Sequence, residues 1–234
     1  PEARWLSRFT DASGVADAYR QGRIFLAGDA AHIHLPSGGP GLLTGFGDAL
    51  NLGFKLAAVI RGKADESLLD TYETERRPVA QGVLTHTRAQ GAVSERSETG
   101  AAIREVMASL TGVPEVIKRL LSRLGQLYTR YANPGDAKHP LIGSFAPDGV
   151  LRTSAGPRRL VELLRDGRGL WLGPKPTRDL RNLLGSYTNR LRIEIAGRGF
   201  RQTSGAEALL IRPDGHIAWA SDAAPSLTPD LGAA

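Results

Sequence analysis

The sequence contains no cysteine among its 234 residues and a single methionine. A chain without cysteine has no disulfide scaffold, no thiolate-ligated zinc or iron–sulfur site and no thiol nucleophile. Long apolar runs are also missing, because no stretch approaches the ~18 consecutive apolar residues of a membrane helix, and the first residues show no signal-peptide pattern. With 41% hydrophobic and 23% charged residues, the composition is that of a folded domain. We therefore expect a cytoplasmic protein without membrane contact.

Lysine is scarce as well, because 25 of the 30 basic residues are arginine. The net charge of +6 is uneven: residues 1–150 carry 17 basic and 16 acidic side chains, and residues 151–234 carry 13 and 8. A basic segment is compatible with a nucleic-acid-binding domain. However, there is no run of five basic residues, no alternation of aromatic and basic residues and no zinc-finger spacing. We favour a solvated, arginine-rich surface and expect no nucleic-acid partner.

Apolar periodicity predicts a largely helical organisation for the first part of the chain. Gly62 stands where a glycine ends the first long helix, Pro78 is expected to stop the second, and Pro114 suits the first position of the last. The predicted elements are a strand at 5–9, a buried strand at 23–28, and helices at 44–60, 67–77, 79–98, 101–110 and 114–131.

The pattern changes after a proline- and glycine-rich stretch at 133–157, which is typical of a linker. Beyond it, Trp171 and Trp219 are expected in the core of a small α/β domain, and Pro213-Asp214-Gly215 is a turn signal. The first domain is thus predicted over 1–132, and the linker with the second domain over 133–234. The predicted elements of the second domain are a helix at 159–165 and strands at 169–172, 191–195, 208–212 and 216–219.

The most informative stretch runs from Gly28 to Leu52: a strand end, an acidic residue, a glycine-rich loop and a helix N-terminus. Asp29 is placed to accept hydrogen bonds from sugar or polyol hydroxyls. Six of the 28 glycines lie between residues 28 and 47, where bare backbone lets N–H groups approach a planar or anionic ligand. The helix N-terminus adds a positive dipole end. The stretch is not a Rossmann fingerprint, because its glycines are spaced one residue too widely for GxGxxG.

Simpler interpretations exist for the same residues. Asp29 alone is compatible with a strand-end cap. His32 and His34 lack a third metal ligand nearby, so structural roles are favoured and no metal is predicted. A hydrolase built on Asp29, His32 and Ser37 is disfavoured because no GxSxG elbow exists. No catalytic side chain is singled out.

Taken together, these motifs resemble the class A FAD-dependent aromatic hydroxylases, the para-hydroxybenzoate hydroxylase-like family that includes polyketide and phenol hydroxylases. Residues 68–80 are similar to the family's next block, and 163–168 with 211–215 are similar to the thioredoxin-like C-terminal domain of longer members. The residues that carry the flavin motif are Gly28-Asp29-Ala30-Ala31-His32, Pro36, Gly39, Gly41 and Asp48-Ala49-x-Asn51-Leu52.

The resemblance implies an α/β fold: the C-terminal part of a Rossmann-like FAD-binding domain with a helical segment, followed by a small thioredoxin-like α/β domain. It implies that Asp29 holds the ribityl chain of FAD, that the loop from Pro36 to Leu43 lines the isoalloxazine, and that Pro36 lies next to the substrate. The chain departs from the family at Leu43, where asparagine is usual. The implied cofactor-binding residues are Gly28, Asp29, Pro36, Gly39, Pro40, Gly41, Leu42 and Leu43.

The activity implied is insertion of one oxygen atom from O₂ into an aromatic, polyketide or phenolic substrate through a flavin C4a-hydroperoxide, with NADPH or NADH as reductant. A Baeyer–Villiger oxygen insertion and a non-catalytic assembly module remain alternatives, the latter using a thioredoxin-like domain that lacks CxxC. Because the dinucleotide-binding GxGxxG is missing, the chain resembles the C-terminal half of such an enzyme. We expect the N-terminal half as its partner, no tight FAD binding or turnover alone, and leave a homodimer open.

Overall fold

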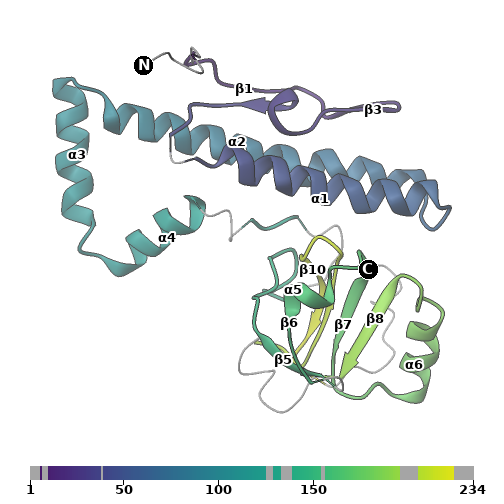
Figure 1. Ribbon diagram of the computed structural model, residues 1–234. Coiled ribbons are helices and arrows are strands. Elements are labelled where there is room, and N and C mark those ends of the chain that lie inside the picture. Colours follow the sequence, from purple (N-terminus) through teal and green to yellow (C-terminus); the bar gives the residue numbers. More distant parts are fainter. Residues whose placement is uncertain are drawn as a thin grey trace. The chain divides into compact units, whose positions relative to one another are not determined.

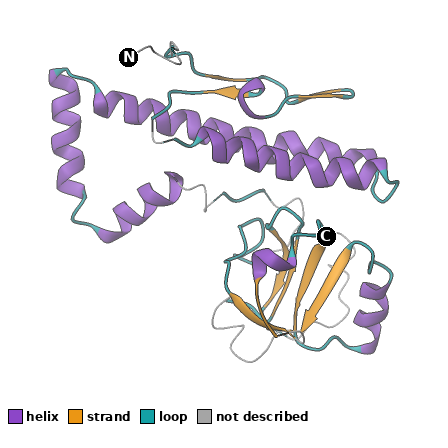
Figure 2. Cartoon of the chain, in the orientation of Figure 1, coloured by secondary structure: helices purple, strands orange, loops and turns teal. Residues whose placement is uncertain are grey.

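The computed structural model of the chain divides into two compact units, residues 1–127 and residues 128–234. Helices predominate in unit 1 and strands gather in unit 2 (Figure 1, Figure 2). The predicted division into 1–132 and 133–234 stays a prediction about folding domains. The residues that the structure describes are 6, 10–37, 39–124, 129–132, 139–153, 156–195 and 205–223.

Long helices make up most of the described part of unit 1. They are α1 (Gly41–Ile60), α2 (Asp70–Ser94), α3 (Glu98–Leu110) and α4 (Pro114–Leu124), with short 3-10 turns η1 (Gly28–Ala30) and η2 (Glu66–Leu69). α1 and α2 lie side by side (Figure 1). α1 begins at Gly41 rather than at the predicted Thr44, and its predicted end is confirmed. Gly62 follows with a φ of 63°, and its N–H donates to the Val59 carbonyl at 2.9 Å.

The predicted helix stop at Pro78 is wrong, because α2 runs through this proline. Pro78 lies on the exposed face of α2, where water can satisfy the carbonyl that a proline leaves without a donor. Buried side chains on either side of it, Arg76 and Ala80, hold the same helix against the rest of the unit. Tertiary packing therefore overrides the local preference that predicted two separate helices at 67–77 and 79–98.

The shorter helices follow the sequence more closely. Ser97 caps α3, since its Oγ accepts the N–H of Gly100 at 3.0 Å. α4 begins at Pro114 as predicted, which confirms this proline as the first helical residue. The helix predicted to reach residue 131 ends at Leu124 among the described residues, since 129–132 are not helical.

The strands of unit 1 are only two residues long. β1 (Gly14–Val15) pairs with β4 (His32–Ile33), and β2 (Arg20–Gln21) pairs with β3 (Ile24–Phe25), both antiparallel. The buried strand predicted at 23–28 is therefore wrong in extent and burial: Ile24 is 68% exposed. β3 belongs to a narrow hairpin, which leaves one face uncovered, and the left-handed Gly28 ends the extended run. The strand predicted at 5–9 lies outside the described residues, apart from an exposed, non-strand Leu6.

The core of unit 1 joins these strand pairs to α2. Tyr19 and Tyr72 are fully buried, with ring centroids 5.8 Å apart. The Tyr72 hydroxyl donates to the Leu26 carbonyl at 2.8 Å, and Arg77 Nε donates to the Ala16 carbonyl at 3.0 Å. These bonds fix the segment that leads into η1 against the first turns of α2.

By length and composition, α1 is the one described helix that is apolar enough to cross a membrane. This property is weak evidence, because core helices of globular proteins share it. The buried residues of α1 are polar: Thr44, Asp48, Asn51 and Lys55. Asp48, Asn51 and Lys55 contact partners on α2, so this face of α1 is directed at protein.

Unit 2 is built on a four-stranded sheet of order β10-β9-β7-β8. β7 and β8 are parallel and are connected through α6, whereas β9 pairs antiparallel with both β7 and β10. This βαβ unit followed by a β-hairpin is the strand arrangement of thioredoxin-like domains, as the resemblance implies. The elements are β5 (Val150–Thr153), β6 (Gly156–Arg159), α5 (Leu160–Leu163), β7 (Gly169–Gly173), α6 (Arg178–Gly185), β8 (Leu191–Ile195), β9 (Ala208–Ile211) and β10 (Ile217–Ser221).

Two apolar clusters cover the faces of this sheet. The first contains Trp171 and Trp219, whose rings stack at 5.7 Å, and it confirms both tryptophans as core residues. The second contains Leu170, Leu172 and Leu209. The alternation of β7 side chains between the two clusters follows from the period of two in a strand. Sequence reasoning missed α6 and the β5–β6 hairpin, and the helix predicted at 159–165 shortens to Leu160–Leu163.

Candidate functional site

The predicted ribityl-binding carboxylate lies on η1, the tight turn before β4. Gly28 opens this turn in a left-handed conformation with a φ of 58°, and the N–H of Ala31 donates to the Gly28 carbonyl at 2.8 Å. Asp29 is exposed and accepts no hydrogen bond from the described residues. Its carboxylate is thus available to a hydroxyl-bearing ligand.

The N-terminus of α1, which follows the same loop, has free backbone N–H groups among the described residues. Pro40 is buried and precedes the helix, and its carbonyl accepts both the N–H and the hydroxyl of Thr44, at 3.0 and 2.8 Å. Within the described part of the chain no side chain caps this end of α1, and its first turn holds no acidic residue. The first-turn N–H groups and the positive end of the helix dipole suit a carbonyl or an anion there.

The loop before α1 depends on two glycines that the resemblance assigns to the cofactor. Gly39 is exposed and has a φ of 66°. A Cβ on Gly41 would lie 3.2 Å from His34 Nε2, so this ring packs directly on the helix start. Pro36 is exposed on the same loop. The structure therefore presents bare backbone where the motif predicts a planar ligand.

Apolar side chains continue from this loop along α1. Leu42 and Leu43 are 72% and 50% exposed, and Phe46 and Leu50 follow with 58% and 56%. Leu42, Phe46 and Leu50 are spaced four residues apart and therefore share one helix face. Nothing among the described residues of unit 1 covers this face.

A buried carboxylate behind the loop connects the turn that carries Asp29 to α1 and α2. The sequence alone assigned no role to this residue. Asp48 on α1 is fully buried. Its Oδ2 accepts the N–H of Gly28 at 3.0 Å and lies 2.7 Å from His32 Nε2, and its Oδ1 accepts Arg76 Nε at 2.7 Å. The one signal in the sequence was the position of Asp48 and Arg76 inside the two family-like blocks.

The protonation of Asp48 follows from these contacts. Burial works to raise the pKa of the carboxyl, but hydrogen bonds from His32 and Arg76 outweigh burial and hold the pKa below its usual value. Asp48 is therefore an anion, neutralised by Arg76. His32, which is 4% exposed, has the structural role that the sequence favoured.

Crowding by a neighbouring side chain explains one more glycine of the motif. A Cβ on Gly47 would lie 2.5 Å from Arg76 Nη2, so only glycine leaves room for the guanidinium. A Cβ on Gly45 would lie 3.6 Å from the Gly28 Cα, an ordinary contact distance, so η1 packs on α1 there without requiring a glycine. Gly47 therefore serves the packing behind the loop rather than a ligand.

A second buried ion pair links α1 to α2 farther along. Glu75 Oε2 accepts Lys55 Nζ at 2.7 Å and Asn51 Nδ2 at 2.6 Å, and Lys55 is 1% exposed. Among the residues that the structure describes, no group of three His, Asp or Glu side chains is arranged to hold a metal ion.

An exposed carboxylate, a glycine-rich loop and an uncapped helix N-terminus lie in one segment, which is the set of groups that the predicted flavin motif requires. The comparisons with known proteins agree. Residues 1–87 match the family model "FAD binding domain", and residues 139–234 match "Aromatic-ring hydroxylase, C-terminal". The chain belongs to the FAD-dependent aromatic-ring hydroxylases.

Named relatives support this family. The chain is 44% identical, over 98% of its length, to a 12-dehydrotetracycline 5-monooxygenase/anhydrotetracycline 6-monooxygenase of Streptomyces rimosus, and 43% identical, over 97%, to a rifampicin monooxygenase of Rhodococcus hoagii. The structure of CabE, an aromatic hydroxylase from angucycline biosynthesis, superimposes with a TM-score of 0.86 at 37% identity, covering 95% of this chain and 46% of that one. The chain covers 45% of each of the two sequence relatives, so it spans less than half their length.

The residues present fit FAD. Asp29 offers an unengaged carboxylate for ribityl hydroxyls, and the helix start offers N–H groups for the isoalloxazine edge. The individual roles of Gly28, Asp29, Pro36, Gly39, Pro40, Gly41, Leu42 and Leu43 stay predictions.

Proposed function

We propose that the protein forms part of an FAD-dependent monooxygenase that inserts one oxygen atom from O₂ into an aromatic substrate of the polyketide or phenol type. NADPH or NADH supplies the electrons. The observation that carries this proposal is the exposed Asp29 beside an uncapped helix N-terminus, both tied to the buried Asp48. The tetracycline and rifampicin monooxygenases among its relatives support the substrate class.

Each part of the site has a role in this proposal. Bound FAD supplies the oxygen chemistry, and the chain binds and orients it. Asp29 accepts hydrogen bonds from the ribityl hydroxyls. The N–H groups at the start of α1, with the helix dipole, stabilise negative charge on the reduced isoalloxazine. Pro36 lies next to the substrate, and Leu43 gives an apolar contact where asparagine is usual.

The proposed partner is a segment that carries the GxGxxG dinucleotide-binding turn, the N-terminal half of the same enzyme. Such a segment binds the ADP part of FAD at a helix N-terminus. Support comes from length, because the chain spans 45% of its first relatives. Assembly as a homodimer and location in the cytoplasm stay predictions.

The experiment combines the chain with the matching N-terminal segment of the Streptomyces rimosus relative. We expect flavin absorbance at one FAD per chain only when both are present, and NADPH-dependent O₂ uptake that rises with an aromatic substrate. Asp29→Asn is expected to weaken FAD binding by about tenfold, the loss of one or two charged hydrogen bonds. Asp17→Asn, which removes another exposed carboxylate of unit 1, is the matched control and should bind FAD normally.

Two results would contradict the proposal. Stoichiometric FAD on the chain alone would remove the need for the partner segment. FAD binding without any NADH or NADPH oxidation would instead favour the assembly-module alternative.

A further inference from the structure

We propose that Asp48, held by Arg76, is a positioning residue for the flavin end of the site. It sets the place of Asp29 relative to the N-terminus of α1, although neither Asp48 nor Arg76 belongs to the predicted cofactor-binding set. The inference rests on the proposed function, because it assumes that FAD binds at Asp29.

The two oxygens of the Asp48 carboxylate divide their contacts between two parts of the chain. Oδ2 accepts the N–H of Gly28, directly before Asp29, and lies against His32 Nε2, three residues after Asp29. Both ends of the turn that presents Asp29 are thus fixed to one oxygen. Oδ1 is left for the guanidinium of Arg76 on α2.

Arg76 extends the same link to the start of α1. While its Nε donates to Asp48, its Nη2 donates to the Thr44 carbonyl at 3.0 Å. Thr44 in turn donates to the Pro40 carbonyl, the last residue of the loop. One guanidinium therefore connects the Asp29 turn to the loop end, and its planar fork suits two contacts in fixed directions.

Stability alone does not explain this arrangement. A buried ion pair is often no more stabilising than an apolar pair of the same size, because desolvating the charges offsets their attraction. The chain already links α1 to α2 through Lys55 and Glu75, with similar burial. Asp48 differs in what it binds, because it accepts the backbone N–H of Gly28, directly before Asp29. Glu75 binds the side chains of Asn51 and Lys55 on α1.

The test compares Asp48→Asn with Glu75→Gln in the FAD-binding assembly described above. Each variant neutralises the carboxylate of one buried α1–α2 ion pair. We expect Asp48→Asn to weaken FAD binding by about tenfold, as for the loss of a charged hydrogen bond, and to change the visible circular dichroism of bound flavin. Glu75→Gln should change thermal stability while FAD affinity stays within about twofold, because the Glu75 carboxylate binds Asn51 and Lys55 farther along α1.

A second pair of variants covers the case in which Asp48→Asn does not fold. Gly47→Ala displaces the Arg76 guanidinium without altering the carboxylate, whereas Gly53→Ala on the same helix meets nothing within 4 Å. We expect the first to weaken FAD binding and the second to leave it unchanged. In the chain without flavin, Gly47→Ala should also speed amide exchange at Gly28.

The outcomes separate the two proposals. Equal losses of FAD affinity in Asp48→Asn and Glu75→Gln, or none in Asp48→Asn and Gly47→Ala, would overturn the positioning role and leave the proposed function intact. Absence of FAD binding in the unaltered assembly would overturn the proposed function, and the inference with it.

Discussion

At the scale of single residues, the buried carboxylates of Asp48 and Asp214 are each held by several partners. In unit 2, Asp214 is 5% exposed and accepts Arg212 Nη2 at 2.6 Å and the backbone N–H of His216 at 3.2 Å. Burial works to raise the pKa of Asp214, but the His216 side chain and the Arg212 charge outweigh it and hold the pKa at about 2. The turn before β10 therefore depends on an ionised carboxylate.

This dependence predicts acid sensitivity of unit 2. A carboxyl whose pKa falls from 3.8 to about 2 on folding stabilises the fold above pH 3.8 and loses that contribution as the pH drops through 2. The loss amounts to about 2 kcal/mol. We expect Asp214→Asn to be less stable than the unaltered protein at pH 7, with the difference shrinking towards pH 2. Chemical denaturation followed by tryptophan fluorescence at both pH values checks this, and an equal difference at both would contradict it.

The residue scale also shows what the sequence revealed of the site. Asp29, the glycines and the loop could be predicted because they follow one another within one short motif. Asp48 and Arg76 lie 28 positions apart, and only the packing of α2 on α1 brings them within 2.7 Å. The sequence assigned Gly47 to the cofactor because Arg76, the side chain that requires a glycine there, is distant in the sequence.

At the scale of elements, predictions succeeded where a local rule and tertiary packing agree. β8 and the end of α1 match the sequence pattern, since alternation and a left-handed glycine define them. The predicted helix end at Pro78 was wrong because proline as a helix terminator is a local rule. It does not account for the buried face of α2, which continues on both sides of this residue. α6 was missed because it is only eight residues long, although Leu180, Leu183 and Leu184 have helical spacing. Thr177 caps it, since the Thr177 Oγ1 accepts the Leu180 N–H at 3.3 Å.

The proline inside α2 gives a prediction at this scale. Proline is less favourable than alanine in a helix interior by about 3 kcal/mol, and Pro78 is exposed, so alanine loses no buried contact. We expect Pro78→Ala to raise the stability of unit 1 by about 1–3 kcal/mol and to slow amide exchange around residue 78. Thermal unfolding by circular dichroism at 222 nm measures it, with the exposed Gln81→Ala as a near-neutral control. A less stable variant would mean that the ring packs against a partner.

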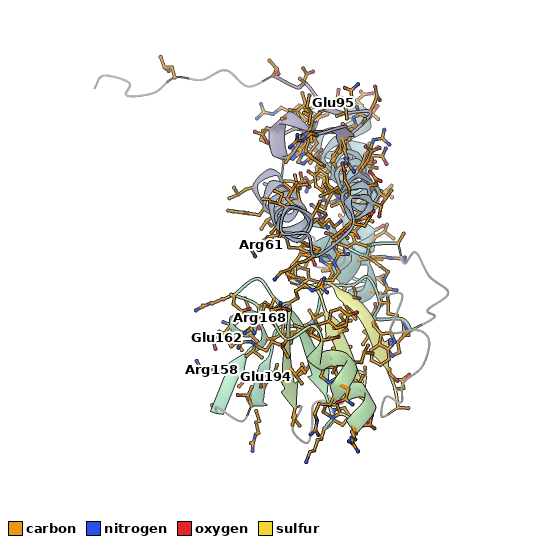
Figure 3. All side chains as sticks on the ribbon, turned by 90° about the vertical axis from the view of Figure 1, so that its right-hand side faces the viewer. Arg61, Glu95, Arg158, Glu162, Arg168 and Glu194 are labelled. Carbon is orange, nitrogen blue, oxygen red and sulfur yellow. The ribbon has the colours of Figure 1, made fainter. Side chains whose placement is uncertain are left out.

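At the scale of the whole molecule, the net positive charge lies mainly in one unit, whereas each unit has its own apolar core. The positive charge concentrates in unit 2, where several arginines pair with acidic neighbours: Asp166 accepts Arg168 and Arg192, and Arg159 pairs with Asp148. Figure 3 shows Arg158 projecting away from the strands of that unit. Such paired, solvated arginines agree with the interpretation of a polar surface. Among the described residues, in contrast, each apolar core cluster draws its side chains from a single unit.

Separate cores predict separate unfolding. Trp171 and Trp219 are in unit 2, so tryptophan fluorescence reports chiefly on that unit, while ellipticity at 222 nm is dominated by the helices of unit 1. Leu209→Ala, at a side chain 1% exposed in the sheet core, should cost about 2–5 kcal/mol. We expect it to shift the fluorescence transition and leave most of the 222 nm transition in place. Val83→Ala on α2, 7% exposed, is the reciprocal variant and should shift the 222 nm transition alone. If either substitution moved both transitions equally, the two units would form one cooperative fold.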